Sequence, residues 1–274
     1  MLKVDVGEGV ALEADVWAGG AGIPFLLVHG LSSNRRTWER VAARLHELDH
    51  PVATVDLRGH GRSDKPDDGY DFATMGDDLL RVLDAVGFPS AVLAGQSTGG
   101  NLVVDLAARA PERVDGVVGV DGGALELSRQ WPDWDDCRKA LAPPPLAGTP
   151  AASIEARIRR GHPTWSEWGL EATLANLEHL PDGTVRPWLT LDRHLRILRA
   201  LWEHRPSEVI PKLDAAVLLV MAGTGDGWEE QKQALGEELS AASAKVRVEW
   251  ITPGDHDLHV ERPEQLADMM HTAF

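Results

Sequence analysis

A serine between glycines is the residue of this chain that is best placed for nucleophilic chemistry. Residues Gly95 to Gly99 read Gly-Gln-Ser-Thr-Gly, with Ser97 in the centre. The apolar run Val92–Ala94 precedes this motif and helical spacing follows it, which predicts a buried strand, a tight turn and a helix. A serine hydroxyl is a weak nucleophile that needs a base, and the N–H groups at a helix N-terminus can bind an oxyanion. The motif therefore indicates covalent catalysis if the chain also supplies a base and an acid.

Candidate partners for the serine stand where other predicted strands end. They are His29, Asp226 and His256, and Asp121 also follows a strand directly. In an open parallel sheet the carboxyl ends of the strands meet at one edge, and ligands bind beyond that edge. We therefore expect these side chains to lie near the serine.

Strands and helices alternate along most of the chain, which predicts an α/β fold with a parallel, doubly wound sheet. Apolar runs that are typical of buried strands lie at residues 23–28, 52–56, 117–120 and 216–221. Val10–Trp17 and Val246–Ile251 alternate between apolar and polar residues, as strands near a sheet edge do. Helices are expected at residues 38–45, 75–86, 98–110, 228–242 and 263–271.

The alternation stops between residues 125 and 206. This segment lacks a convincing buried strand, and its helical stretches alternate with proline-rich breaks. We predict a helical cap, residues 125–206, inserted into a core of residues 1–124 and 207–274 and placed over a pocket. Most tryptophans of the cap are expected to form its own core. Four of them are candidates for lining the substrate pocket: Trp131, Trp134, Trp165 and Trp168.

Composition limits the partners and the location that we expect. A formal net charge of −16 argues against nucleic acid or an anionic membrane surface as a partner. The sequence shows neither a charged-then-apolar leader nor an apolar run of membrane-spanning length, and its single cysteine fits a reducing cytoplasm. We therefore expect a cytoplasmic protein. The cysteine, Cys137, is expected to be an ordinary surface or half-buried thiol.

No cofactor or metal site is expected. The histidines do not pair with carboxylates at metal-ligand spacing on one element, and the cluster His256–His259 is too slight by itself. No Gly-x-Gly-x-x-Gly motif opens a helix after the first strands, so a dinucleotide site is not predicted either.

Five motifs in a fixed order point to a family. They are His-Gly-Leu at 29–31, Asp-Leu-Arg-Gly-His-Gly-Arg-Ser at 56–63, Gly-Gln-Ser-Thr-Gly-Gly at 95–100, Gly-Thr-Gly-Asp at 223–226, and Gly-Asp-His at 254–256 with Glu-Arg-Pro at 261–263. With the order serine, aspartate, histidine, the chain resembles an α/β-hydrolase-fold serine hydrolase of the esterase- and lipase-like superfamily. The resemblance covers nearly the whole chain outside the insertion. It implies a mostly parallel sheet of about eight strands with a helical cap.

The resemblance also implies the roles of a catalytic triad. Ser97 would attack an acyl carbon, and His256 would take its proton and return it to the leaving group. Asp226 would fix the tautomer of the histidine, with Asp121 as the alternative acid. His259, on the same loop as His256, is the rival base.

Backbone groups complete the implied site. The N–H groups of Leu31 and Thr98 would bind the oxyanion. The two histidines nearby are expected to structure loops rather than to catalyse. His29 precedes the turn that aims Leu31, and His60 is expected to form a hydrogen bond within its own turn.

The predicted activity is cleavage of a small carboxylic ester through an acyl-enzyme intermediate, with a small, largely apolar acyl substrate as the partner. Serine at position 97 excludes the aspartate and cysteine nucleophiles that occur in the same fold. Lactone, thioester, amide and carbon–carbon bond hydrolysis by the same triad remain alternatives, as does a non-hydrolytic protein that binds a small ligand. No pattern in the sequence assigns an oligomeric state.

Overall fold

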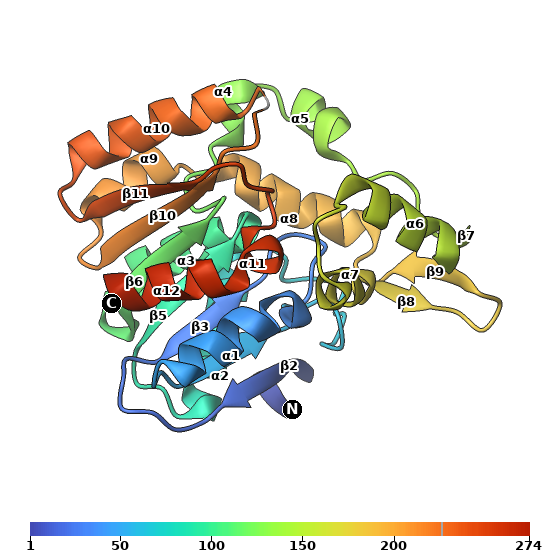
Figure 1. Ribbon diagram of the computed structural model, residues 1–274, viewed down its shortest axis with the longest axis horizontal. Coiled ribbons are helices and arrows are strands. Elements are labelled where there is room, and N and C mark those ends of the chain that lie inside the picture. Colours follow the sequence, from blue (N-terminus) through green and yellow to red (C-terminus); the bar gives the residue numbers. More distant parts are fainter. Residues whose placement is uncertain (226) are drawn as a thin grey trace.

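An eight-stranded sheet runs through the part of the chain that the computed structural model describes, residues 1–225 and 227–274 (Figure 1). In spatial order its strands are β1 (Leu2–Gly7), β2 (Val10–Trp17), β4 (Val52–Val55), β3 (Phe25–Val28), β5 (Ala91–Gln96), β6 (Val114–Val120), β10 (Ala216–Ala222) and β11 (Val246–Ile251). β2 pairs antiparallel with β1 and with β4, and the other neighbours pair parallel. The predicted α/β fold class is confirmed.

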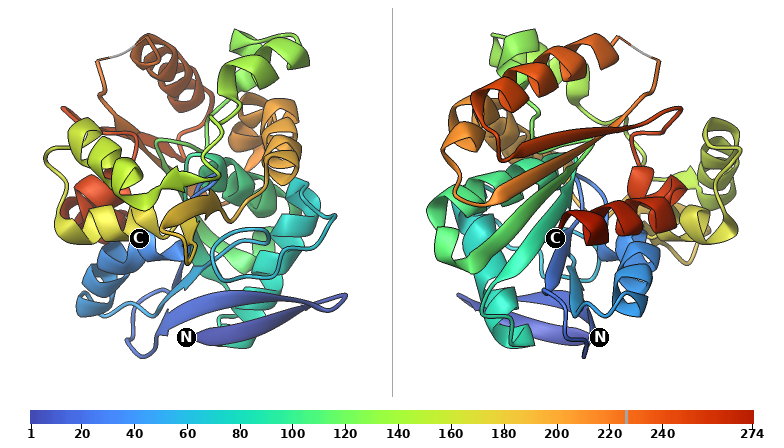
Figure 2. Two further views of the ribbon diagram at one scale, coloured as in Figure 1. Left: turned by 90° about the vertical axis from the view of Figure 1, so that its right-hand side faces the viewer. Right: turned by 60° about the vertical axis from the view of Figure 1, so that its left-hand side comes forward.

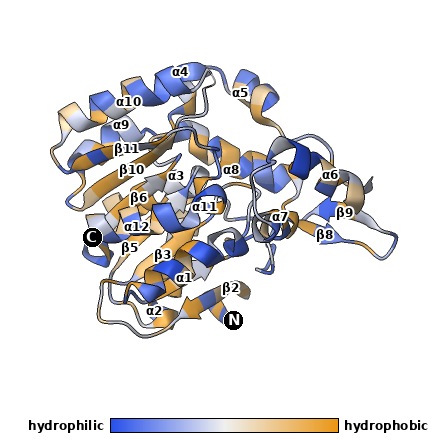
Figure 3. Ribbon diagram, viewed as in Figure 1, coloured by the Kyte–Doolittle hydropathy of each residue, from blue (hydrophilic) through white to orange (hydrophobic). Residues whose placement is uncertain are grey.

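The central strands are buried because their residues are apolar on both faces. Every residue of β3 and β4 is buried, and Leu27 of β3 lies in register between Thr54 and Ala94 of the two neighbouring strands. Figure 3 shows the strands in the middle of the sheet coloured as hydrophobic, while the helices around them mix both colours. β11 lies at the edge, as its alternating sequence predicts, and only Val246 and Ile251 in it are buried.

Helices cover both faces of the sheet, which Figure 2 shows edge-on in its right-hand view. On one face α1 (Glu39–Glu47) packs against α12 (Pro263–Ala273). The short helices η1 (Arg35–Trp38) and α11 (Leu258–Glu261) lie beside them. Leu45 and Leu266 from this layer share an apolar core with Phe25, so the last helix of the chain closes over its first parallel strand.

The opposite face carries α2 (Phe72–Val86), α3 (Thr98–Arg109) and α10 (Glu229–Ala242). Short helices connect to them: η2 (Pro111–Arg113), α9 (Pro206–Val209) and η3 (Ile210–Lys212). Asp71 caps α2 by accepting the N–H of Thr74, and Gly87 ends that helix in the left-handed conformation. No helix in the described ranges has both the length and the apolar composition to cross a membrane.

The chain between β6 and β10 leaves the sheet and forms a group of short elements, of which α6, α7, β8 and β9 lie on the right of Figure 1. In order they are α4 (Leu127–Gln130), α5 (Trp134–Leu141), β7 (Thr149–Pro150), α6 (Ala151–Gly161), α7 (Glu167–Leu174), β8 (Leu177–His179), β9 (Thr184–Pro187) and α8 (Leu191–Glu203). Besides its helices, this segment contains β7, β9 and β8, which form a small antiparallel sheet that no pattern in the sequence predicted. These strands are two to four residues long and leave no buried apolar run in the sequence. The cap limits at residues 125 and 206 stay predictions.

The single cysteine is also placed differently from the prediction. Cys137 of α5 is completely buried and belongs to the main apolar core, rather than lying at or near the surface. It is the buried position of α5, and this helix packs against α8. Burial raises the pKa of its thiol, so this side chain behaves as a small apolar residue.

The loop after β6 makes close backbone contact with the turn at Ser97. A Cβ atom on Gly122 would lie 2.2 Å from the carbonyl oxygen of Ser97 and 2.5 Å from its nitrogen. Both separations are far below van der Waals contact, so only glycine allows this approach. The position of Ser97 therefore depends on the loops of two neighbouring strands, β5 and β6.

Gly122→Ala is expected to destabilise the protein by about 1–3 kcal/mol, the usual cost of overpacking. The matched control is Gly236→Ala in α10, where a Cβ atom would meet Val248 at an ordinary 3.4 Å. Alanine should stabilise that helix by roughly 0.5–1 kcal/mol. Urea unfolding measures both changes, and a Gly122→Ala variant as stable as the wild type would contradict the close approach.

Candidate active site

A cavity of about 380 Å³ lies at the carboxyl ends of the parallel strands. Four residues reach it from the loops after β3, β5, β6 and β11, respectively: Leu31, Ser97, Asp121 and His256. Much of the rest of its lining is apolar and consists of Leu125, Leu127, Leu141, Leu198, Leu201 and Trp228. Of the strand-end groups predicted from the sequence, Ser97, Asp121 and His256 are thus brought to one cavity, between the sheet and the chain that follows β6.

Ser97 forms a sharp turn between β5 and α3. Its backbone angles are φ 51° and ψ −122°, a conformation that L-residues rarely adopt and that typically costs 1–3 kcal/mol. The Ser97 N–H donates to the carbonyl of Val120 at 3.0 Å, which ties the turn to the neighbouring strand. A strained serine held between a strand and a helix matches the predicted turn, and its side chain lines the cavity.

Asp121 is the carboxylate that pairs with His256 in the described structure. The Nδ1–H of His256 donates to Asp121 Oδ2 at 2.5 Å, although the two residues are 135 positions apart in the chain. The Asp121 side chain is fully buried, whereas that of His256 is 47% exposed at the cavity. Because Nδ1 is engaged, Nε2 is the nitrogen left to exchange a proton with a substrate or nucleophile. Asp226, the acid preferred on sequence grounds, lies outside the described residues.

Charges around this pair shift both pKa values. Burial raises the pKa of the Asp121 carboxyl, but His256, the Lys232 ammonium and the N–H of Ala222 outweigh burial and hold that pKa below its ordinary value. Desolvation lowers the pKa of His256, but the hydrogen bond to Asp121 and the charges of Asp257 and Asp121 together raise it above the usual value. Asp121 is therefore an anion that favours a proton on His256.

His29 orients the peptide bond that precedes Leu31. Its Nδ1–H donates to the carbonyl of Gly30 at 2.8 Å, and its Nε2 accepts the N–H of Leu57 at 3.0 Å. In a trans peptide the carbonyl and the following N–H point in opposite directions. Because the Gly30 carbonyl points toward His29, the N–H of Leu31 points away from His29.

His60 supports the same loop from the next turn. Its Nε2 accepts the N–H of Ser32 at 3.1 Å, and its Nδ1–H donates to the carbonyl of Arg58 at 2.9 Å, so the predicted hydrogen bond within its own turn is confirmed. Burial lowers the pKa of His60 well below the usual value, and the pKa of His29 is lowered for the same reason. Both rings stay neutral, as their accepting nitrogens require.

Two backbone N–H groups at the cavity are free to bind an anion. No hydrogen bond from the N–H of Leu31 or of Thr98 occurs within the described ranges, although both residues line the cavity beside Ser97. Thr98 is the first residue of α3, where an N–H has no partner inside the helix. That these two N–H groups form an oxyanion hole stays a prediction.

The four tryptophans predicted for the pocket lie elsewhere. They are Trp131, Trp134, Trp165 and Trp168, and they contact Trp228, Trp202, His162 and Glu39, respectively. None of the four is among the described residues that line the cavity; the tryptophan found there is Trp228, at the start of α10. A tryptophan that packs against another part of the protein has the same sequence pattern as one that faces a ligand.

Two ionisable residues that line the cavity, Lys232 and His194, were not predicted. Lys232 of α10 contacts Asp121, and no sequence motif indicates this. His194 of α8 is 7% exposed, its Nδ1 lies 2.9 Å from Ser32 Oγ, and burial lowers its pKa to about 4. His194 does have a sequence signal, because it continues the buried stripe formed by Ile197, Leu198 and Leu201.

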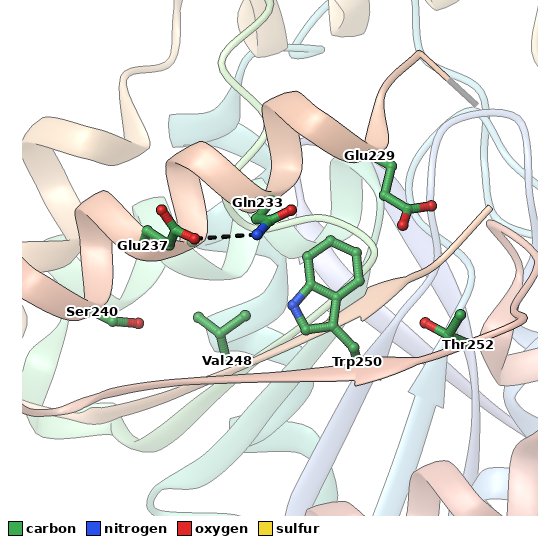
Figure 4. Close-up of a pocket in the computed structure, with 8 residues that line it drawn as sticks. Glu229, Gln233, Glu237, Ser240, Val248, Trp250 and Thr252 are labelled. Atoms are coloured by element: carbon green, nitrogen blue, oxygen red, sulfur yellow. Dashed lines mark hydrogen bonds between the residues drawn. The ribbon is translucent and has the colours of Figure 1, made fainter. Parts of the chain in front are cut away.

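A second hollow lies away from this site, between α10 and the edge strand β11. In Figure 4, Val248 and Trp250 of the strand face Gln233 and Glu237 of the helix, which are joined by a hydrogen bond of 3.2 Å. Its described lining contains no histidine and no cation. Within the described ranges, no group of three or more potential ligand side chains is placed to hold a metal ion.

Comparison with known proteins places the fold. Residues 23–157 match the model of the family described as the alpha/beta hydrolase fold. The chain belongs to this fold family. A crystal structure of E-2-(acetamidomethylene)succinate hydrolase superimposes on it with a TM-score of 0.81 at 22% identity, covering 99% of this chain and 97% of that one. At that identity the likeness establishes the fold.

Relatives within the α/β-hydrolase family are named for different activities. A putative non-heme haloperoxidase of Mycobacterium phage D29 is 37% identical over 105 residues, 38% of either chain. Esterase YbfF of Escherichia coli is 28% identical over 245 residues, 88% of this chain and 89% of the esterase. The match to the haloperoxidase thus spans well under half of that protein, while the match to the esterase is nearly complete.

The buried histidines should make this hydrolase-fold protein sensitive to acid. The pKa of His194 is about 4 in the folded protein and 6.5 in a model peptide, so the unfolded chain takes up the proton first. Folding stability is therefore lost as the pH falls from about 6.5 to about 4. Between pH 7 and 4.5, the free energy of unfolding of the His194→Phe variant is expected to fall by about 2 kcal/mol less than that of the wild type.

The measurement is urea unfolding at several pH values. His179→Gln, which changes an exposed histidine of the cap, serves as the control. Equal acid sensitivity of the His194→Phe variant and the wild type would show that His194 is not buried as a neutral ring.

Proposed function

We propose that this protein is a serine hydrolase that cleaves a small carboxylic ester through Ser97, His256 and Asp121. The observation that carries the proposal is the 2.5 Å hydrogen bond from His256 Nδ1 to Asp121, formed at a cavity that Ser97 also lines. A strained serine, an imidazole with one nitrogen held by a buried carboxylate, and free N–H groups are the parts that acyl transfer needs.

The chemistry would proceed in two halves. His256 Nε2 takes the proton of the Ser97 hydroxyl as its oxygen attacks the ester carbonyl, and the imidazolium is stabilised by the carboxylate of Asp121. The carbonyl oxygen becomes an oxyanion that accepts the N–H groups of Leu31 and Thr98. His256 then gives its proton to the departing alcohol, which leaves an ester between Ser97 and the acyl group.

Water completes the cycle. His256 Nε2, now unprotonated, takes a proton from a water molecule that attacks the acyl carbon, and it returns the proton to Ser97 as the acid departs. The N–H groups that bind the first oxyanion serve the second one as well. No group beyond the triad and the backbone is needed for either half.

The cavity supports a small, largely apolar acyl substrate. Leucine side chains form much of its wall, and its volume of about 380 Å³ is at the lower end for small-molecule sites. Because the net charge is −16, we propose no nucleic acid and no anionic membrane as a partner. A cytoplasmic location, expected from the single cysteine, belongs to the same proposal.

Ser97→Ala is expected to lower kcat for p-nitrophenyl esters of short acids by about 10⁴-fold or more, because the nucleophile is lost. A fluorophosphonate probe should label the wild type at Ser97 and leave the variant unlabelled. Esters, lactones, thioesters and amides with the same acyl group, compared by kcat/KM, identify the bond that is cleaved. Undiminished ester hydrolysis by the alanine variant would rule out this mechanism.

Two aspartate variants distinguish the candidate acids. Asp121→Asn should lower kcat by about 10³–10⁴-fold, since the amide cannot hold the histidine tautomer or stabilise its cation. Asp226→Asn should stay within a few-fold of the wild type. The reverse pattern would assign the acid to Asp226, and thermal unfolding of both variants separates loss of the acid from loss of the fold.

A further inference from the structure

The lysine at the start of α10 contacts the proposed catalytic acid directly. Lys232 Nζ lies 2.8 Å from Asp121 Oδ1 and 2.9 Å from Oδ2, so the ammonium bridges both carboxylate oxygens. It also donates to the carbonyl of Ala222, at the end of β10, at 3.3 Å. The lysine side chain is 11% exposed and that of Asp121 is fully buried. Such an ion pair is little screened by solvent and geometrically restrained.

Three donors from different elements therefore surround one carboxylate. His256 donates to Oδ2, the N–H of Ala222 donates to Oδ1 at 3.0 Å, and Lys232 contacts both oxygens. A carboxylate on a loop can rotate about its side-chain bonds, and these donors limit that rotation. Lys232 and Ala222 together hold the oxygen that His256 does not use.

The lysine also changes the charge that His256 faces. Without it, an imidazolium at His256 would lie against a carboxylate with no other cation nearby and would be strongly favoured. With it, the acid and the lysine form a pair of zero net charge, so the proton on His256 is held less tightly. A base that is protonated in the resting enzyme cannot accept the proton of Ser97, so this balance affects the working pH.

Other ionisable groups surround His256, and their effects must be separated from that of Lys232. They are Asp255 and Asp257 on its own loop, His259 on α11, and His162 of the cap, which contacts Asp255 at 2.5 Å. The carboxylates favour a proton on His256. Lys232 is the group on α10 that opposes them, since it repels a proton on the ring.

We propose that Lys232 is a positioning residue that fixes Asp121 beside His256 and lowers the affinity of the imidazole for protons. This inference rests on the proposed function. It assigns to α10, an element outside the predicted motifs, control over the pH range in which the enzyme works.

The test compares kcat/KM against pH for the wild type, Lys232→Met, Lys232→Gln and Lys232→Arg with a p-nitrophenyl ester. The acidic limb reports ionisation of the base in the free enzyme. Loss of the positive charge should move this limb upward by about one pH unit in the Met and Gln variants. Arginine keeps the charge, so its limb should stay close to that of the wild type. Lys245→Met, which removes an exposed lysine before β11, controls for net charge.

A purely structural role would predict a different result. It would lower kcat/KM by the same factor at every pH and leave the acidic limb in place, and that outcome for the Met and Gln variants would overturn the proposal. If the Met variant fails to fold, the Gln and Arg variants still compare a neutral with a charged side chain at position 232, because both retain a hydrogen-bond donor.

A measurement that needs no turnover keeps this inference separate from the proposed function. NMR titration of the His256 ring in the substrate-free protein should show its pKa rising in the Met and Gln variants and unchanged in Lys245→Met. If Ser97→Ala retained full activity, the hydrolase mechanism would fail while this titration still tested the role of Lys232. An unchanged His256 titration in both neutral variants would refute the lysine proposal.

Discussion

The hydrogen bond between Asp121 and His256 is the contact on which the proposed site depends. It connects the loop after β6 with the loop after β11, and β10 lies between these two strands in the sheet. The carboxylate is buried, and a buried charge is stable only with close partners. β10 supplies one through the N–H of Ala222, and α10 supplies another through Lys232. The acid is thus held by the order of the strands and by a helix packed over them.

Histidines serve two opposite purposes around this site. His29 and His60 are buried and neutral, and each uses both ring nitrogens to orient backbone groups of the loops near Leu31. His256 instead faces the cavity, and among the described residues one of its nitrogens is engaged, by an anion. The difference follows from burial and partners, since the residue type is the same. Rigid neutral rings support the proposed oxyanion site, and an accessible ring beside a carboxylate provides the base.

Much of the fold was predictable because its signals are local. Apolar runs defined the buried strands, and the alternating residues of Val246–Ile251 correctly indicated an edge. The turn at Ser97 followed from glycines whose absence of a Cβ atom allows close approach. The cap was harder, because its strands are too short to produce a pattern and Cys137 is buried among polar neighbours in sequence. Likewise, the spacing of the tryptophans does not separate those that pack against other parts of the protein from those that would face a ligand.

Local sequence was enough to indicate the parallel sheet, the tight turn that carries Ser97, the loop that carries His256 and the helix that begins after Ser97. These features depend on residues within a few positions of one another, and short-range sterics and hydrogen bonding control them. Contacts between residues far apart in the sequence place Asp121 beside His256 in the described structure, and they bring Lys232 and His194 to the cavity. Aspartates that end different strands look alike in sequence. Strand order and helix placement determine which of them meets the ring, because the residues involved are more than a hundred positions apart.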